Sequence, residues 1–91
     1  MDLQEMRGLV RDVVWYETHY GDEADSYAAE GLTVDIDATV EAVFEKLLND
    51  GTYNEVQGME RWLYEETVHL AALDYFSSWE PVLIRMEAAN A

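Results

Sequence analysis

The 91-residue sequence contains no cysteine, one proline and one lysine. Without cysteine, a disulfide framework, a thiolate metal site and a cysteine nucleophile are all excluded. No apolar run approaches the roughly 20 residues that span a bilayer, and the first residues lack the basic and apolar regions of a secretory signal. We therefore expect a cytoplasmic protein that does not contact membranes.

Positive charge is also scarce, because 20 Asp and Glu residues face only 5 Lys and Arg, which gives a formal charge of −15. Direct binding to nucleic acid or anionic lipid needs clustered Lys and Arg, so both are disfavoured. Three Trp, six Tyr and two Phe argue against an acidic disordered chain. The length predicts a single acidic helical domain over residues 1–91.

Two segments have the clearest helical spacing. Apolar residues recur every three or four positions over 2–20 and 37–48, as on one face of an α-helix. Asp2 and Asp37 are the expected N-caps, and the run 49–51 is the expected end of the second helix.

The remaining segments are less regular. We expect a short helix over 22–30, an extended connector over 32–36 without a partner strand, and a long helix from about 52 to 76. A last helix is predicted after the break at 77–81, because proline disrupts a helix interior. The prediction is an all-α fold, a compact bundle of four to five helices with one short extended connector.

The most distinctive feature is the charge pattern. Ten acidic residues and no Lys or Arg lie between Asp12 and Glu45, and three of these acids recur every four residues in the helix expected over 37–48. This spacing predicts a negatively charged stripe that a basic protein could bind, with electrostatic steering and strong salt dependence. The expected partner-binding residues are Asp22, Glu23, Asp25, Glu30, Asp35, Asp37, Glu41 and Glu45. The alternative is a solvated surface that serves solubility or a halophile's structural module, although acids four residues apart repel one another.

Other chemistry has weaker signals. Glu66 and His69 have the Glu-x-x-His spacing of di-iron bundles, but such sites need two motifs, so an ordinary surface pair is favoured over a metal-binding helical homodimer. No phosphate loop or nucleophile elbow is present, and we expect neither a cofactor nor enzymatic activity.

The aromatic residues are expected mostly in the core or at its edge, which is their usual place in a small domain. Tyr and Trp are also enriched at interfaces, so some could contribute to a homodimer. The expected self-association surface is the last helix, with Trp79, Val82, Leu83 and Met86.

The stretch from Glu30 to Asp37, which leads into the acidic helix, resembles the acidic phage antirestriction DNA mimics, and the size and charge are similar to those of many anti-CRISPR proteins. The resemblance implies a stoichiometric inhibitor that occupies the nucleic-acid-binding site of a defence nuclease or its recognition complex. The alternative within this class is an immunity protein or antitoxin against a basic nuclease.

Overall fold

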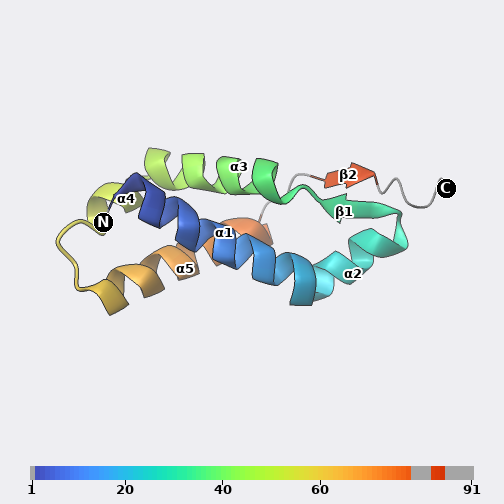
Figure 1. Ribbon diagram of the computed structural model, residues 1–91, viewed down its shortest axis with the longest axis horizontal. Helices are drawn as coiled ribbons and strands as arrows, with labels where there is room; N and C mark the ends of the chain where they lie inside the picture. Colours follow the sequence, from blue (N-terminus) through green and yellow to red (C-terminus); the bar gives the residue numbers. More distant parts are fainter. Residues whose placement is uncertain (1, 79–82, 86–91) are drawn as a thin grey trace.

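The computed structural model describes residues 2–78 and 83–85, and helices dominate this part of the chain. The five helices are α1 (Leu3–Tyr20), α2 (Asp22–Ala29), α3 (Ile36–Asn49), α4 (Thr52–Glu55) and α5 (Arg61–Ser78). The all-α prediction is confirmed. The molecule is elongated, with extents of 50 × 19 × 19 Å, and α1, α3 and α5 lie along the long axis (Figure 1).

Helix α1 is the centre of the packing, because it contacts both α3 and α5. Its buried face follows the predicted spacing, with Met6, Val10, Val13 and Val14 almost completely shielded from solvent. Asp2 caps the helix as expected, since its side chain accepts a hydrogen bond of 2.8 Å from the Glu5 N–H. The apolar stripe and the cap therefore both act as the sequence indicates.

Helix α3 has its N-cap two residues before the predicted one. Asp35, not Asp37, caps it by accepting a hydrogen bond of 3.1 Å from the Ala38 N–H. The earlier start places Ile36 in the helix, where it packs against the core. Asp37 then lies in the first turn, where a carboxylate interacts favourably with the helix dipole.

The long helix expected from residue 52 is divided. Gly58 has a φ of +84°, a left-handed conformation that ends helical geometry, and the chain reverses between α4 and α5. The apolar residues of α5 divide between the core and the surface. Leu63 and Leu70 are exposed, whereas Val68 and Ala72 are buried.

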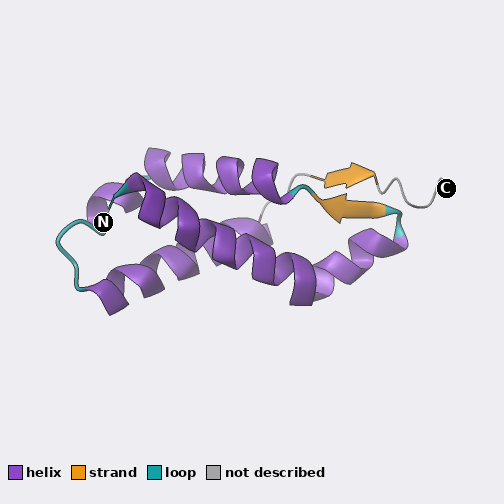
Figure 2. Ribbon diagram, in the orientation of Figure 1, coloured by secondary structure: helices purple, strands orange, loops and turns teal. Residues whose placement is uncertain are grey.

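The segment expected as an unpaired connector forms a strand. β1 (Leu32–Val34) pairs antiparallel with β2 (Leu83–Arg85), with Val34 opposite Leu83 (Figure 2). The predicted last helix is therefore wrong at residues 83–85, because pairing with β1 satisfies their backbone hydrogen bonds in an extended conformation. The sequence could not show this, since three residues are too few to establish a strand period.

The core joins side chains from α1, α3 and α5, with Val34 of β1 and Val56 after α4 at its margins. Its largest fully buried side chains include Met6 and Leu47. Within residues 2–78 and 83–85, no helix combines the length and the apolar character that a membrane span requires.

Candidate functional site

The predicted partner-binding acids fall into two groups. Asp22 and Glu23 lie in the first turn of α2, Asp25 is exposed on the same helix, and Glu30 is the exposed residue at its end. Because α2 lies beside β1 at one end of the molecule, this group is separated from most of α3 (Figure 1). The structure therefore does not gather all eight acids on one face.

The second group lies on α3, where the arginines of α1 approach it. The Arg11 guanidinium contacts the Asp37 carboxylate at 2.5 Å, and Arg7 forms an ion pair with Glu41. Both arginines also lie one helical turn apart on α1, so the antiparallel helices meet through two successive cross-helix pairs. The remaining member of the stripe, Glu45, is exposed.

These contacts reduce the net charge of the predicted negative stripe. Asp37, Glu41 and Glu45 together carry a charge of −3, and Arg7 with Arg11 contributes +2, so the local net charge is −1. The sequence window that began at Asp12 excluded the two arginines. Their spacing of four residues, away from the apolar face of the first helix, was the signal that could have identified them.

Asp35 has a structural role because its side chain caps α3. Asp50 has a similar role at the turn before α4. It accepts hydrogen bonds of 2.9 Å from the Thr52 N–H, 2.6 Å from the Thr52 hydroxyl and 2.5 Å from the Tyr75 hydroxyl. Burial raises the pKa of Asp50, but these hydrogen bonds lower it more, so the net shift is downward. The pKa of Asp50 is therefore lowered by the hydrogen bonds of a local turn, and the bond from Tyr75 connects the end of α3 to α5.

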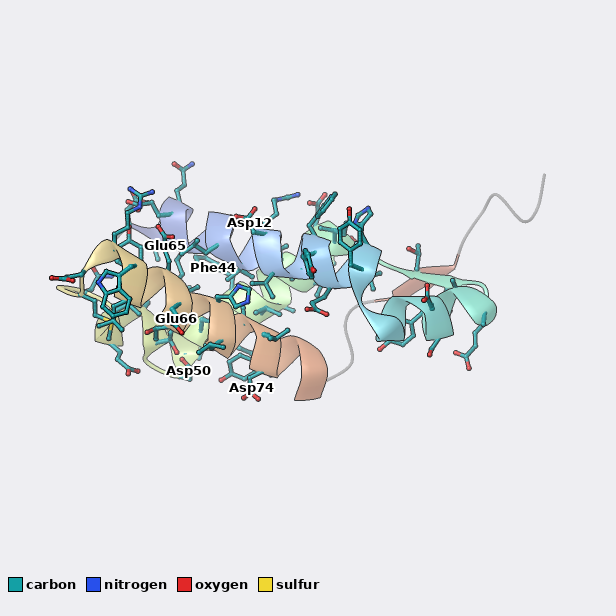
Figure 3. All side chains as sticks on the ribbon, turned by 90° about the horizontal axis from the view of Figure 1, so that it is seen from below. Asp12, Phe44, Asp50, Glu65, Glu66 and Asp74 are labelled. Carbon is teal, nitrogen blue, oxygen red and sulfur yellow. The ribbon has the colours of Figure 1, made fainter. Side chains whose placement is uncertain are left out.

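A shallow cavity of about 300 Å³ lies between α1 and α5. Gly8 and Leu9 contribute its small and apolar lining, and the polar lining consists of Glu5, Arg11, Asp12, Arg61, Tyr64 and Glu65. The labelled carboxylates of Asp12 and Glu65 come from the two facing helices (Figure 3).

The cavity's polar groups largely pair with the chain itself. Arg61 contacts Glu65 at 2.7 Å, and the Tyr64 hydroxyl donates a hydrogen bond of 3.0 Å to Glu5. Burial and this hydrogen bond raise the pKa of Tyr64, while the Glu65 carboxylate raises the pKa of Arg61. With Arg11 directed to Asp37, the two cations of the lining are already engaged.

Two further predictions have different outcomes. Glu66 and His69 are both exposed on α5, and no group of three or more potential metal ligands occurs among the residues that the structure describes. Of the expected self-association surface, Leu83 lies in β2 and not in a helix. Trp79, Val82 and Met86 lie outside the described residues.

The aromatic residues divide between the predicted positions and the surface. Phe44 is buried, and Tyr27, Tyr53, Tyr64 and Tyr75 pack against the core, as predicted. Trp15, Tyr16, Tyr20 and Trp62 are 45%, 58%, 66% and 64% exposed, so they are not core residues. A partial signal of this exposure was present in the sequence, because the apolar face of α1 is already filled by residues such as Val13 and Val14. Because each residue rotates by about 100° around the helix axis, Trp15 and Tyr16 turn away from the stripe that includes Val13 and Val14.

Comparison of the chain with protein-family models, with curated proteins and with solved structures finds no match in any of the three.

Proposed function

We propose that this chain is a stoichiometric inhibitor that binds a basic protein at its nucleic-acid-binding site, with a defence nuclease or its recognition complex as the target class. The observation that carries the proposal is the excess of carboxylates that remains after the chain's own cations are paired. Arg7, Arg11 and Arg61 each contact a carboxylate of the chain, yet the formal charge is still −15.

The charge density supports a comparison with nucleic acid. One DNA strand carries a charge about every 3.4 Å, so a 50 Å length carries about 15 charges. The chain has a net charge of −15 over an extent of 50 Å. A duplex of that length carries about 29 charges, roughly twice as many. The proposed site on the partner is therefore a basic groove that follows a single strand.

Exposed carboxylates such as those of Asp25, Glu30 and Glu45 are available to such a partner. Solvated charges of one sign raise the association rate with an oppositely charged groove, and this effect declines steeply with ionic strength. Binding would exclude nucleic acid by occupying the same basic side chains, and no chemical step is required.

The test is affinity capture from a lysate of the source cells at low and moderate salt, with bound proteins identified by mass spectrometry. The immobilised proteins are the wild type and two triple variants that both have a net charge of −12. One carries Asp25→Asn, Glu30→Gln and Glu45→Gln, which removes exposed acids of α2, α3 and the turn between α2 and β1. Asp37 and Glu41 are left intact, because changing them would also remove the bridges to α1.

The matched control carries Glu55→Gln, Glu60→Gln and Glu66→Gln, which neutralises three exposed acids elsewhere. We expect a nucleic-acid-processing protein that wild type retains at low salt, that added nucleic acid displaces, and that the first variant loses. Loss by the control variant alone would contradict the assignment to α2 and α3. Capture of no specific partner, or of unrelated basic proteins by all three, would refute the proposed function.

A further inference from the structure

The C-terminal half of α1 carries an ordered group of aromatic rings that the core does not use. Trp15 stacks on His19 with ring centroids 4.1 Å apart, Tyr16 lies 5.1 Å from Tyr20, and Trp15 meets the edge of Tyr20 at 6.0 Å. The His19 Nδ1–H donates a hydrogen bond of 2.8 Å to the Trp15 carbonyl. These four residues are named here the α1 aromatic cluster.

The rings of this cluster contact one another along the helix surface, and three of them are about half exposed or more. Their helix packs against the core through other positions, including Val13 and Val14. Clustered exposed aromatics mark binding surfaces more often than isolated ones, because Trp and Tyr supply much of the binding energy at interfaces. The mutual stacking also holds the rings in place before any partner arrives.

The chemistry of the surroundings identifies the kind of partner. Asp12 is exposed and precedes Trp15 by three residues and Tyr16 by four, so it lies on the same side of α1. The nearest cation along the helix is Arg11, and its guanidinium is paired with Asp37. A carboxylate beside exposed aromatic faces is a favourable environment for a cation, and for arginine in particular, because a planar guanidinium stacks on rings.

The chain uses the same interaction elsewhere. Arg7 lies over the Phe44 ring at 4.7 Å, and Lys46 lies over the Tyr75 ring at 5.9 Å. Among residues 2–78 and 83–85, no Lys or Arg lies over a ring of the α1 aromatic cluster. The cluster therefore presents aromatic faces whose cations would have to come from another molecule.

We propose that the α1 aromatic cluster is the surface on which this chain receives an arginine-bearing segment of its basic partner. A guanidinium stacks on Trp15 or Tyr16 and donates hydrogen bonds to the Asp12 carboxylate. The inference rests on the proposed function for the basic character of the partner, and it adds the type of side chain that is recognised. A second copy of this chain is a poorer occupant, because each copy carries a charge of −15.

The probe is a synthetic ten-residue peptide of alternating arginine and glycine, compared with one in which uncharged citrulline replaces arginine. For fluorescence, Trp62→Phe and Trp79→Phe leave Trp15 as the sole indole. Titration with the arginine peptide is expected to change the Trp15 emission at low salt, and the citrulline peptide is expected to bind at least tenfold more weakly. No binding of the arginine peptide up to millimolar concentration would overturn the proposal.

Affinity is then measured by the anisotropy of a labelled arginine peptide against three variants of the full chain. Trp15→Ala with Tyr16→Ala should weaken binding at least tenfold. Trp15→Leu with Tyr16→Leu keeps apolar bulk but removes the aromatic faces, and it should weaken binding to a similar degree. Trp62→Ala is the control, because Trp62 is more exposed than Trp15 and Tyr16 but has no ring neighbour among the described residues, and it should change affinity less than twofold.

Circular dichroism is used to check that the variants keep their helix content. The leucine pair serves as the test if the alanine pair does not fold. Equal losses at Trp62 and the cluster, or full binding by the leucine pair, would overturn the stacking proposal. So would a dimer in sedimentation that the substitutions at Trp15 and Tyr16 abolish.

The variant with Asp25→Asn, Glu30→Gln and Glu45→Gln separates this inference from the proposed function. If acid neutralisation weakens peptide binding and removal of the aromatic faces does not, the acidic surface stands and the cluster is refuted. If neither change weakens binding, both proposals fail. If only removal of the aromatic faces weakens it, the cluster stands and the acids assigned under the proposed function are wrong.

Discussion

Arg7 of α1 makes two different contacts with α3. Its replacement by glutamine tests how much these contacts contribute to the stability of the protein. The guanidinium forms an ion pair with Glu41 of α3, and it lies 4.7 Å from the centroid of the Phe44 ring. Arg7→Gln removes the charge from both contacts while keeping a polar side chain of moderate length. The variant should therefore loosen the contact between α1 and α3 without creating a cavity.

The expected loss follows from the exposure of the two contacts. The Arg7 and Glu41 side chains are 45% and 57% exposed, so the ion pair contributes about 0.2–1 kcal/mol. A partly exposed cation–π contact contributes roughly 0.5–1 kcal/mol. Together they predict a decrease of about 0.7–2 kcal/mol in the free energy of unfolding. For a domain of this size, the middle of that range lowers Tm by roughly 5–10 °C.

The assay is urea unfolding at 25 °C followed by circular dichroism, in about 0.05 M and 1 M NaCl. Arg61→Gln is the control, because it changes the net charge equally but removes only an ion pair within α5. Arg7→Gln should cost more than Arg61→Gln at both salt concentrations. The difference should shrink in 1 M NaCl but not vanish, since the ring contact is screened less than the exposed ion pair.

A result in which both variants lose the same stability would refute this reasoning, because it would assign the whole effect to net charge. Complete loss of the difference in 1 M NaCl would refute the contribution of the Phe44 ring. A double-mutant cycle with Glu41→Gln then measures the ion pair alone.

The remaining predictions concern packing, backbone and pH. Leu47→Ala should lower the free energy of unfolding by about 2–5 kcal/mol in urea melts, because Leu47 is fully buried; a loss below 1 kcal/mol would contradict its place in the core. Gly8→Ala and Gly58→Ala should have opposite signs in the same assay. The first adds a methyl in open space within α1 and should stabilise by about 0.5–1 kcal/mol, whereas the second forces a side chain to a φ of +84° and should destabilise by about 1–2 kcal/mol. Tyr75→Phe should raise the pKa of Asp50 toward its ordinary value, measured by NMR titration of its carboxyl. Because the folded pKa of Asp50 is lowered, Asp50 contributes stability above its unfolded pKa of 3.8 and loses it as pH falls through the folded value. Tyr75→Phe should therefore lose less stability in acid than wild type. An unchanged pKa of Asp50 in this variant would contradict the hydrogen bond from Tyr75.

The sequence by itself determined the helical class and the position of α1 and α3. Their apolar residues recur at helical spacing, and local signals such as the Asp2 cap and the stop at 49–51 act within one turn of the chain. The residues of such a helix define its position in the sequence, and any apolar surface that covers its apolar stripe can stabilise it. The excess of acidic residues is likewise a property of composition alone.

Contacts between distant residues were decided only by the tertiary structure. The sequence placed Arg7 and Arg11 outside the acidic segment, but the antiparallel packing of α1 and α3 brings them onto Asp37 and Glu41. The pairing of β1 with β2 joins segments about 50 residues apart, so no local period could indicate it. Both features depend on which helix faces which, and that is set by the packing of the whole core.

The exposure of the aromatic residues has the same physical origin. Trp15 and Val14 are adjacent and both apolar, but only Val14 lies on the side of α1 that α3 and α5 can cover. The hydrophobic effect favours the burial of apolar side chains, but it does not determine which side of a helix the neighbouring elements cover. The sequence therefore determined that this protein is helical, acidic and rich in aromatics, and the packing of α1 decided which of its aromatic groups remain at the surface.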